Sequence, residues 1–142
     1  MAGETANADG YNTTAFSGHG RQLCVLDVTH EFTTGQLELA DKLRIGKVPA
    51  GAIYVGGYLA TDDLDSNVSP ALVLDVGDDD ASNGLLDGAT TGQAAAITTF
   101  NGTYITNKTT VSAEKTISIT VQTAAATAAA GTARVVLYYY VP

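Results

Sequence analysis

The feature that most constrains the fold of this chain is a set of short segments in which apolar and polar side chains alternate with a period of two. Over residues 22–32, one face carries Cys24, Leu26, Val28, His30 and Phe32. The opposite face carries Asp27, Thr29 and Glu31. This period is that of a half-buried β-strand, and no segment shows the longer apolar stripe that an amphipathic helix needs. The sequence therefore predicts an all-β fold.

Further segments with the same signals predict most of a sandwich. We expect strands at residues 36–45, 50–61, 71–76, 103–111, 116–123 and 132–141. Asp41 interrupts the apolar face of the first of these, which indicates a bulge or bend, and Gly46 and Pro49 end it. Gly56 and Gly57 in the middle of the second predict a bulge or a close approach of another backbone.

Two segments are rich in small residues and lack a strand pattern. Residues 85–100 contain an Ala cluster but no amphipathic stripe, so we interpret them as a loop with one or two helical turns. Residues 124–131 are far shorter than the ~12 residues that an isolated helix needs, so we interpret them as a connection. Short strands without βαβ alternation favour an antiparallel β-sandwich, with a jelly roll ahead of an immunoglobulin-like arrangement.

Length and composition predict one domain preceded by an arm. A chain of 142 residues hides ~68% of its unfolded surface, which is enough for one core, and we assign that core to residues 21–142. Residues 1–20 contain only Tyr11 and Phe16 as large apolar groups beyond Met1. This extended N-terminal arm is either a disordered tail or a segment that becomes ordered on a neighbouring subunit, with Tyr11 and Phe16 as anchors.

The last predicted strand differs from the others because both of its faces are apolar. One face carries Val135, Leu137, Tyr139 and Val141, and the other carries Val136, Tyr138 and Tyr140. A strand of a sandwich normally shows one polar face to water. Either the domain's own loops or arm cover the second face, or another subunit does, and Tyr is favoured at such interfaces. We therefore predict Tyr11, Phe16, Val136, Tyr138 and Tyr140 as interface residues.

The sequence contains none of the familiar catalytic motifs. It has no GxSxG nucleophile elbow, no HExxH pair and no phosphate-binding loop, and His19 and His30 lie too far apart for a local metal motif. His30, at a strand end, is interpreted as a structural residue. Cys24 is the only cysteine, which excludes an internal disulfide, and its alternation with apolar residues predicts a buried thiol. We predict no catalytic residue, no cofactor and no bound metal.

Two acidic clusters are the best remaining candidates for chemistry. They consist of Asp62, Asp63 and Asp65 in one loop and Asp78, Asp79, Asp80 and Asp87 in another. The second loosely imitates the start of a calcium loop, but its closing carboxylate position falls on Ala89. A glycosidase would need one carboxyl group in an apolar setting. We interpret both clusters as hydrated turns rather than as a calcium or catalytic site.

Charge and hydropathy exclude several classes of partner. The net charge of −8 would repel nucleic acid phosphates. No segment approaches the ~20 apolar residues that span a bilayer, and the first residues do not have the pattern of a signal peptide. We therefore expect a soluble protein without a nucleic acid or membrane partner.

Three segments carry a resemblance to a known family: LRIGKVPAGAIYVGG, ALVLDVGDDD and TARVVLYYYV. Together, across roughly residues 21–142, they resemble small capsid-associated structural proteins of tailed bacteriophages, the decoration or cement proteins. The resemblance implies a non-enzymatic β-sandwich that attaches in many copies to the major capsid protein, often as a homotrimer. It implies a place on the capsid exterior after assembly in the host cytoplasm, and the acidic balance agrees, since packaged DNA would repel it.

Other functions stay open at this point. A carbohydrate-binding or host-surface-binding sandwich would need an exposed aromatic platform, and the absence of Trp argues against one. Another head or tail subunit of a phage would share the same fold and composition. A hydrolase that uses the acidic loops is the least favoured class.

Overall fold

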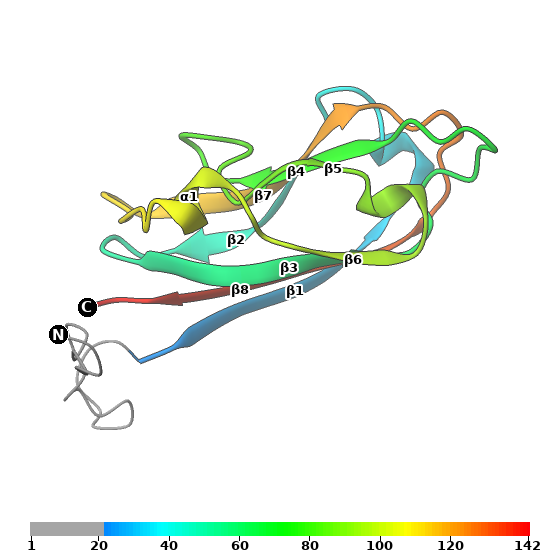
Figure 1. Ribbon diagram of the computed structural model, residues 1–142. Coiled ribbons are helices and arrows are strands. Elements are labelled where there is room, and N and C mark those ends of the chain that lie inside the picture. The colour runs from blue at the N-terminus through cyan, green and yellow to red at the C-terminus, as the bar shows by residue number, and fades with distance from the viewer. Residues whose placement is uncertain (1–21) are drawn as a thin grey trace, which may run out of the picture.

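The alternating segments pair into two antiparallel sheets over residues 22–142, the part of the chain that this computed structural model describes (Figure 1). The strands are β1 (Cys24–Phe32), β2 (Lys42–Val48), β3 (Ile53–Thr61), β4 (Val73–Gly77), β5 (Leu86–Ala89), β6 (Ala96–Thr99), β7 (Lys115–Thr123) and β8 (Gly131–Tyr140). Three short helical elements connect them: η1 (Thr34–Gln36), η2 (Thr91–Gln93) and α1 (Thr103–Thr106). The predicted arm of residues 1–20 lies outside the described part.

The pairing of the strands follows a simple rule. The order is β1-β8-β3-β6 in one sheet, here called the first sheet, and β2-β7-β4-β5 in the other, the second sheet. Each strand therefore pairs with its counterpart from the other end of the chain: β1 with β8, β2 with β7, β3 with β6 and β4 with β5. This is the pairing order of a jelly roll, in which two Greek keys form two sheets. The prediction of an all-β antiparallel sandwich is confirmed.

The core lies between the two sheets and is built from one face of every strand except β6, which contributes no buried side chain. On β7, the alternation of Ile117, Ile119 and Val121 points these side chains inward, and all three are buried. The other large buried side chains are Phe32, Leu37, Tyr54, Leu59, Leu64, Leu72, Leu74, Leu85, Leu86 and Leu137. Because the inner faces pack against each other, only the outer face of each sheet is available to a partner.

The predicted strand over residues 36–45 is wrong in its bounds. Residues 34–36 form η1, and β2 begins only at Lys42. Ala40 has a φ of 67°, and the Asp41 carboxylate accepts a hydrogen bond from the Glu38 amide at 2.9 Å, so this stretch is a turn. Gly46 does not end the strand but lies at a register shift inside it, after Arg44.

The segment from 85 to 111 was predicted least well. Residues 85–100 contain β5 and β6, which the sequence did not indicate, on either side of the expected helical turn. Leu86 and Ala89 are both buried, with Gly88 between them at a φ of 68°, so the period-2 pattern is broken. The strand expected at 103–111 is wrong: α1 forms there, and Tyr104 packs against Gly84 and donates to Asp78 at 2.8 Å. This tertiary contact outweighs local β-propensity.

Cys24 is half-buried rather than part of the core, which corrects the predicted buried thiol. Its strand alternates as expected, but the inward residues of β1 before Phe32 are only half-buried. The reason is position: β1 is an edge strand of the first sheet, so only one neighbour covers it.

The predicted bulge in β3 is confirmed. The register with β8 shifts between Tyr54 and Gly56, so Val55 and Gly56 together oppose Tyr138. Gly57 follows with a φ of 154°, and a Cβ there would overlap the carbonyl oxygen of Val136. A Cβ on Gly56 would meet nothing within 4 Å.

Gly57→Ala is expected to lower the free energy of unfolding by about 2–3 kcal/mol, because a side chain at a positive φ is strained and the added methyl group overlaps the next strand. Gly56→Ala, one residue away in the same bulge, should change it by less than about 1 kcal/mol. Urea denaturation of the two variants measures the difference. Equal losses would contradict this account of the bulge.

Candidate interaction surface

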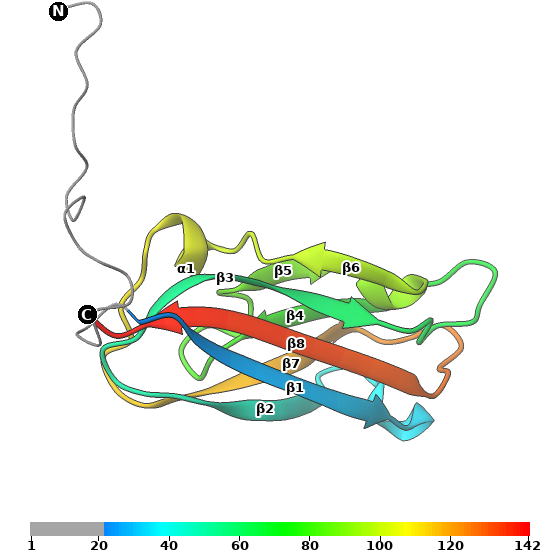
Figure 2. The same cartoon turned by 90° about the horizontal axis from the view of Figure 1, so that it is seen from below.

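The outer face of the first sheet contains the predicted interface residues that the structure describes. Figure 2 looks onto this sheet, in which β8 lies between β1 and β3. Tyr138 and Tyr140 are half-buried, whereas Val136 is only 3% exposed. Val136 is buried yet is not part of the core cluster, as expected for a residue on the outer side of the sheet. Tyr11 and Phe16 lie outside the described residues.

Neighbouring strands extend the apolar surface around these tyrosines. Val25 of β1 pairs directly with Tyr138, and the bulge places Val55 on the other side of it. Leu23 precedes β1 and Val141 follows β8 at the same end of the sheet. Leu23, Val25 and Val55 are 56%, 53% and 48% exposed. We call this surface the terminal patch; it consists of Leu23, Val25, Val55, Tyr138 and Tyr140.

An ion pair bounds the terminal patch. The Arg134 guanidinium donates from Nε to Asp27 Oδ1 at 2.8 Å and from Nη2 to Asp27 Oδ2 at 2.6 Å. It also lies 6.0 Å from the centre of the Tyr58 ring. The hydrogen bonds from Arg134 hold the pKa of Asp27 below its ordinary value. Beyond this pair the face forms a groove of about 360 Å³ between Thr29, Ala60 and Ile97.

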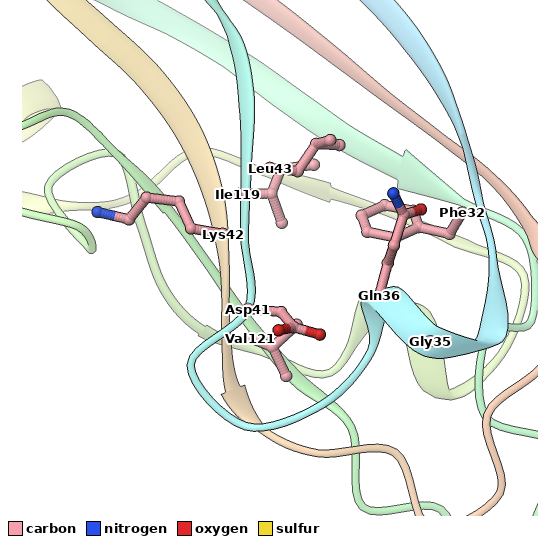
Figure 3. Close-up of a pocket in the computed structure, with 8 residues that line it drawn as sticks. All are labelled: Phe32, Gly35, Gln36, Asp41, Lys42, Leu43, Ile119 and Val121. Atoms are coloured by element: carbon pink, nitrogen blue, oxygen red, sulfur yellow. The ribbon is translucent and has the colours of Figure 1, made fainter.

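A second, smaller cavity opens at the η1 turn (Figure 3). Its volume is about 150 Å³, with Phe32, Leu43 and Ile119 among its apolar lining and Asp41 and Lys42 among its polar lining. Typical small-molecule sites start at roughly 300 Å³. Its lining contains no nucleophile paired with a base, so it gives no support to a catalytic site.

His30 has a structural role beside this cavity. It is half-buried, its Nε2 lies 3.1 Å from Gln36 Oε1, and its ring meets the Phe32 ring edge-on at 5.0 Å. The Gln36 amide oxygen also accepts a hydrogen bond from the Thr33 amide. His30 therefore orders the turn after β1, as its sequence position suggested.

The first acidic cluster is not a simple hydrated turn, because Asp65 is buried. Its carboxylate accepts hydrogen bonds from five backbone amides, at 2.7–3.3 Å: those of Asn67, Ala71, Leu72, Ala126 and Thr127. Burial by itself raises the pKa of Asp65, but the hydrogen bonds outweigh it and hold the pKa well below the usual range. Asp65 thus fastens the loop after β3 to the connection between β7 and β8. The predicted hydration holds for Asp62 and Asp63, which are exposed.

The second cluster also has a buried member. Asp78 accepts hydrogen bonds from Tyr54 Oη at 3.2 Å and Tyr104 Oη at 2.8 Å, and the two tyrosine rings stack at 5.5 Å. Burial, together with Asp78, raises the pKa of both tyrosines. Asp79 accepts from the Thr116 amide, and Asp80 pairs with Lys115 at 2.9 Å. These carboxylates hold loops and strands together.

The acidic residues do not converge on a common point. Within residues 22–142, no group of three or more His, Cys, Asp or Glu side chains has an arrangement that could hold a metal ion. The same part of the chain contains no helix with the length and apolarity to cross a membrane.

Sequence reasoning found Tyr138 and Tyr140 of the terminal patch but missed Leu23, Val25 and Val55. Val25 lies on the face of β1 that otherwise carries Asp27, Thr29 and Glu31, and the alternation of that segment did not single it out. Val55 lies in the bulge itself, where the register with β8 shifts. Val25 itself was a signal, because it is an apolar residue on an otherwise polar strand face. Next to a strand that is apolar on both faces, such a residue indicates that the apolar surface continues onto the neighbouring strand.

Comparisons with solved structures find capsid components. A chain in the capsid asymmetric unit of cyanophage Pam1 matches with a TM-score of 0.77 and 29% sequence identity, over 100% of both chains. A chain of the capsid of Ralstonia phage GP4 matches with a TM-score of 0.71 and 26% identity, over 88% of this chain and 86% of that one. A chain of the acid-stable capsid of Helicobacter pylori bacteriophage KHP30 shares the fold, with a TM-score of 0.58 and 17% identity over 85% and 93% of the two chains.

The first two similarities support a structural role in a phage virion. No family model matches the chain, and no curated protein matches it.

Asp65→Asn is expected to lower the free energy of unfolding by about 3 kcal/mol, because the amide nitrogen cannot accept and leaves buried N–H groups without partners. Asp63→Asn, an exposed neighbour, should have little effect.

The effect of Asp65→Asn should also depend on pH. A carboxyl group whose pKa is lowered by folding stabilises the fold at pH values above its unfolded pKa of about 3.9. The difference between wild type and Asp65→Asn should therefore be constant from pH 7 to 5 and shrink as pH falls below 4. Acid and urea titrations measure it; a difference that shrinks already above pH 5 would contradict it.

Proposed function

We propose that this chain is a decoration or cement protein that binds the outer face of a phage head and stabilises it. The observation that carries the proposal is the match to a chain of the Pam1 capsid asymmetric unit over the full length of both chains. The match has a sequence identity of 29% and a TM-score of 0.77. The partner in this proposal is the major capsid protein, and the chain acts as a homotrimer on the capsid exterior.

The terminal patch supports docking to protein rather than chemistry. Single exposed apolar side chains are ordinary, but a contiguous apolar surface on a sheet face marks an interaction site. Val25, Tyr138 and Val55 form one row across three strands, so a partner can bury them together. Tyrosines at the centre and aliphatic groups around them are a composition typical of interface cores.

Attachment in many copies explains how modest contacts stabilise a head. A patch of this size gives limited affinity alone, because association costs translational and rotational entropy. When subunits are joined to one another, each further contact with the lattice becomes intramolecular, and its effective concentration rises. The net charge of −8 suits the exterior, away from packaged DNA.

The rival functions are less well supported by the same surface. Among residues 22–142, no aromatic side chain belongs to the group of strongly exposed large apolar residues, so an aromatic platform for sugars is not presented. A different head or tail subunit would share the fold. Copy number and position on the particle, seen by electron microscopy, separate that alternative from a decoration protein.

Tyr138→Ala combined with Tyr140→Ala is expected to abolish occupancy on purified heads that lack the protein while leaving the isolated fold largely intact. Removing an interface tyrosine costs about 2 kcal/mol or more, so two should lower the affinity well over tenfold. Co-sedimentation with heads and circular dichroism measure both effects.

A second variant avoids the half-buried tyrosines. Val25→Glu with Val55→Glu changes only exposed side chains of the terminal patch, and it should also abolish head binding. Val68→Glu, on a fully exposed loop, is the matched control and should bind as wild type does. Normal occupancy of both patch variants would refute the assignment of the terminal patch.

A further inference from the structure

The edge strands of the sandwich differ in how well they are protected against pairing with a further strand. β5 and β6 are only four residues long. β2 has a register shift between Arg44 and Gly46, and it carries three exposed cationic side chains, Lys42, Arg44 and Lys47. Short edge strands, bulges and charged side chains, lysine above all, are common devices against unwanted pairing. Each of these three edges therefore has such a device.

The edge of β1 is the least protected. β1 is nine residues long, lies at the margin of the first sheet and pairs with β8 without a register shift (Figure 2). It contains no Lys, Arg or Pro, and of its two carboxylates, Asp27 is paired with Arg134, which leaves Glu31. Within residues 22–142, β8 is the only strand that pairs with β1. Alternate N–H and C=O groups along β1 can therefore pair with one more strand.

The side chains of β1 are also incompletely covered. The side chains that point towards the second sheet are only half-buried: Cys24, Leu26, Val28 and His30. On the outer face, Leu23 and Val25 are 56% and 53% exposed. A strand added beside β1 would continue both faces of the sheet, so it would bury apolar surface on each of them if it carried a large apolar side chain on each.

The chain itself supplies such a strand directly before β1, in residues that lie outside the described part. Residues 11–16, YNTTAF, are rich in the aromatic and β-branched residues that favour strands. Residues 17–21 follow and contain Gly18 and Gly20. A connection of roughly three to five residues with Gly between two strand-like segments is typical of a hairpin. This connection would place residues 11–16 antiparallel beside residues 22–27.

The two aromatic residues of this segment suit both faces of the sheet. Tyr11 and Phe16 are separated by an odd number of positions, so they lie on opposite faces of a strand in any register. One then extends the terminal patch, and the other covers the half-buried inward side chains of β1. We infer that residues 11–16 pair with the free edge of β1 in the same chain, as a fifth strand of the first sheet.

A strand from the same chain has an advantage over one from another molecule. Because the connection to β1 is short, the effective concentration of residues 11–16 at this edge is high. The pairing makes β1 an inner strand and leaves a short strand at the new edge, which is a protective device that the other edges already have. It involves one molecule only, so it stands whether or not the chain decorates a head.

Amide hydrogen exchange of the full chain, followed by NMR, tests the inference. Thr13→Pro combined with Thr14→Pro removes an N–H that faces β1 in either register. In this variant, the amides on the free edge of β1 within residues 22–27 should exchange at least about tenfold faster than in wild type. Thr5→Pro combined with Ala6→Pro is the matched control, because it lies in the same arm but outside the pairing segment, and it should exchange as wild type does.

A mixing experiment identifies the chain that supplies the strand. When the isotope-labelled Thr13→Pro and Thr14→Pro variant is mixed with an excess of unlabelled wild type, its β1 amides should remain fast-exchanging. Slow exchange in that mixture would show that the strand comes from another copy, and it would overturn the inference. Wild-type amides that exchange at this edge as fast as those of the variant would overturn it as well. Slow exchange of the β7 amides in every sample shows that the sandwich is intact.

Discussion

The packing of two sheets through the inner faces of their strands is the constraint on which the rest of this molecule depends. With a period of two, each inward side chain leaves its neighbours in sequence on the outside. The inner positions must be apolar and complementary in shape, as those of β7 and β4 are, and only the outer positions are free to vary. Recognition by this domain therefore depends on the outer faces of its sheets, and the outer face of the first sheet is apolar at the terminal patch.

The buried carboxylates stabilise the loops as the apolar core stabilises the strands. A sandwich leaves its connections at the ends, where backbone amides lack partners from the ladder. Asp65 supplies two acceptor oxygens to five such amides from segments far apart in sequence. Asp78 holds Tyr54 and Tyr104 in the same way, through their hydroxyl groups. Clusters of aspartate that suggest a cation site in sequence thus act here as internal acceptors, and the loops become as well fixed as the strands.

Sequence patterns predicted the parts of this fold in which local and tertiary preferences agree. β1 and β7 alternate cleanly, β8 is apolar on both faces, and the two glycines of β3 marked a real bulge. β5 and β6 are four residues each, which is too short to show the alternation of apolar and polar side chains. Gly88 also interrupts the alternation in β5. Tyr104 of α1 belongs to a residue type that favours strands. Its contact with Asp78 joins residues that are distant in sequence, so no local pattern indicates it. Sequence reasoning found Tyr138 and Tyr140 of the terminal patch, because both lie on one face of the same strand. Val25 and Val55 join them only through the pairing of β1 and β3 with β8, which the sequence does not reveal.

The pairing of the first strand with the last has a consequence for how the chain acquires its structure. β8 is the inner neighbour of both β1 and β3, so the first sheet has no central strand until β8 has been synthesised. Until then β1 and β3 have unpaired backbone N–H and C=O groups, and such strand edges can pair with other chains. Folding must then close the longest loop in the molecule, which is slow. Loss of β8 would therefore leave β1 without a partner strand and β3 with an unpaired edge, because both pair with β8 along most of their length.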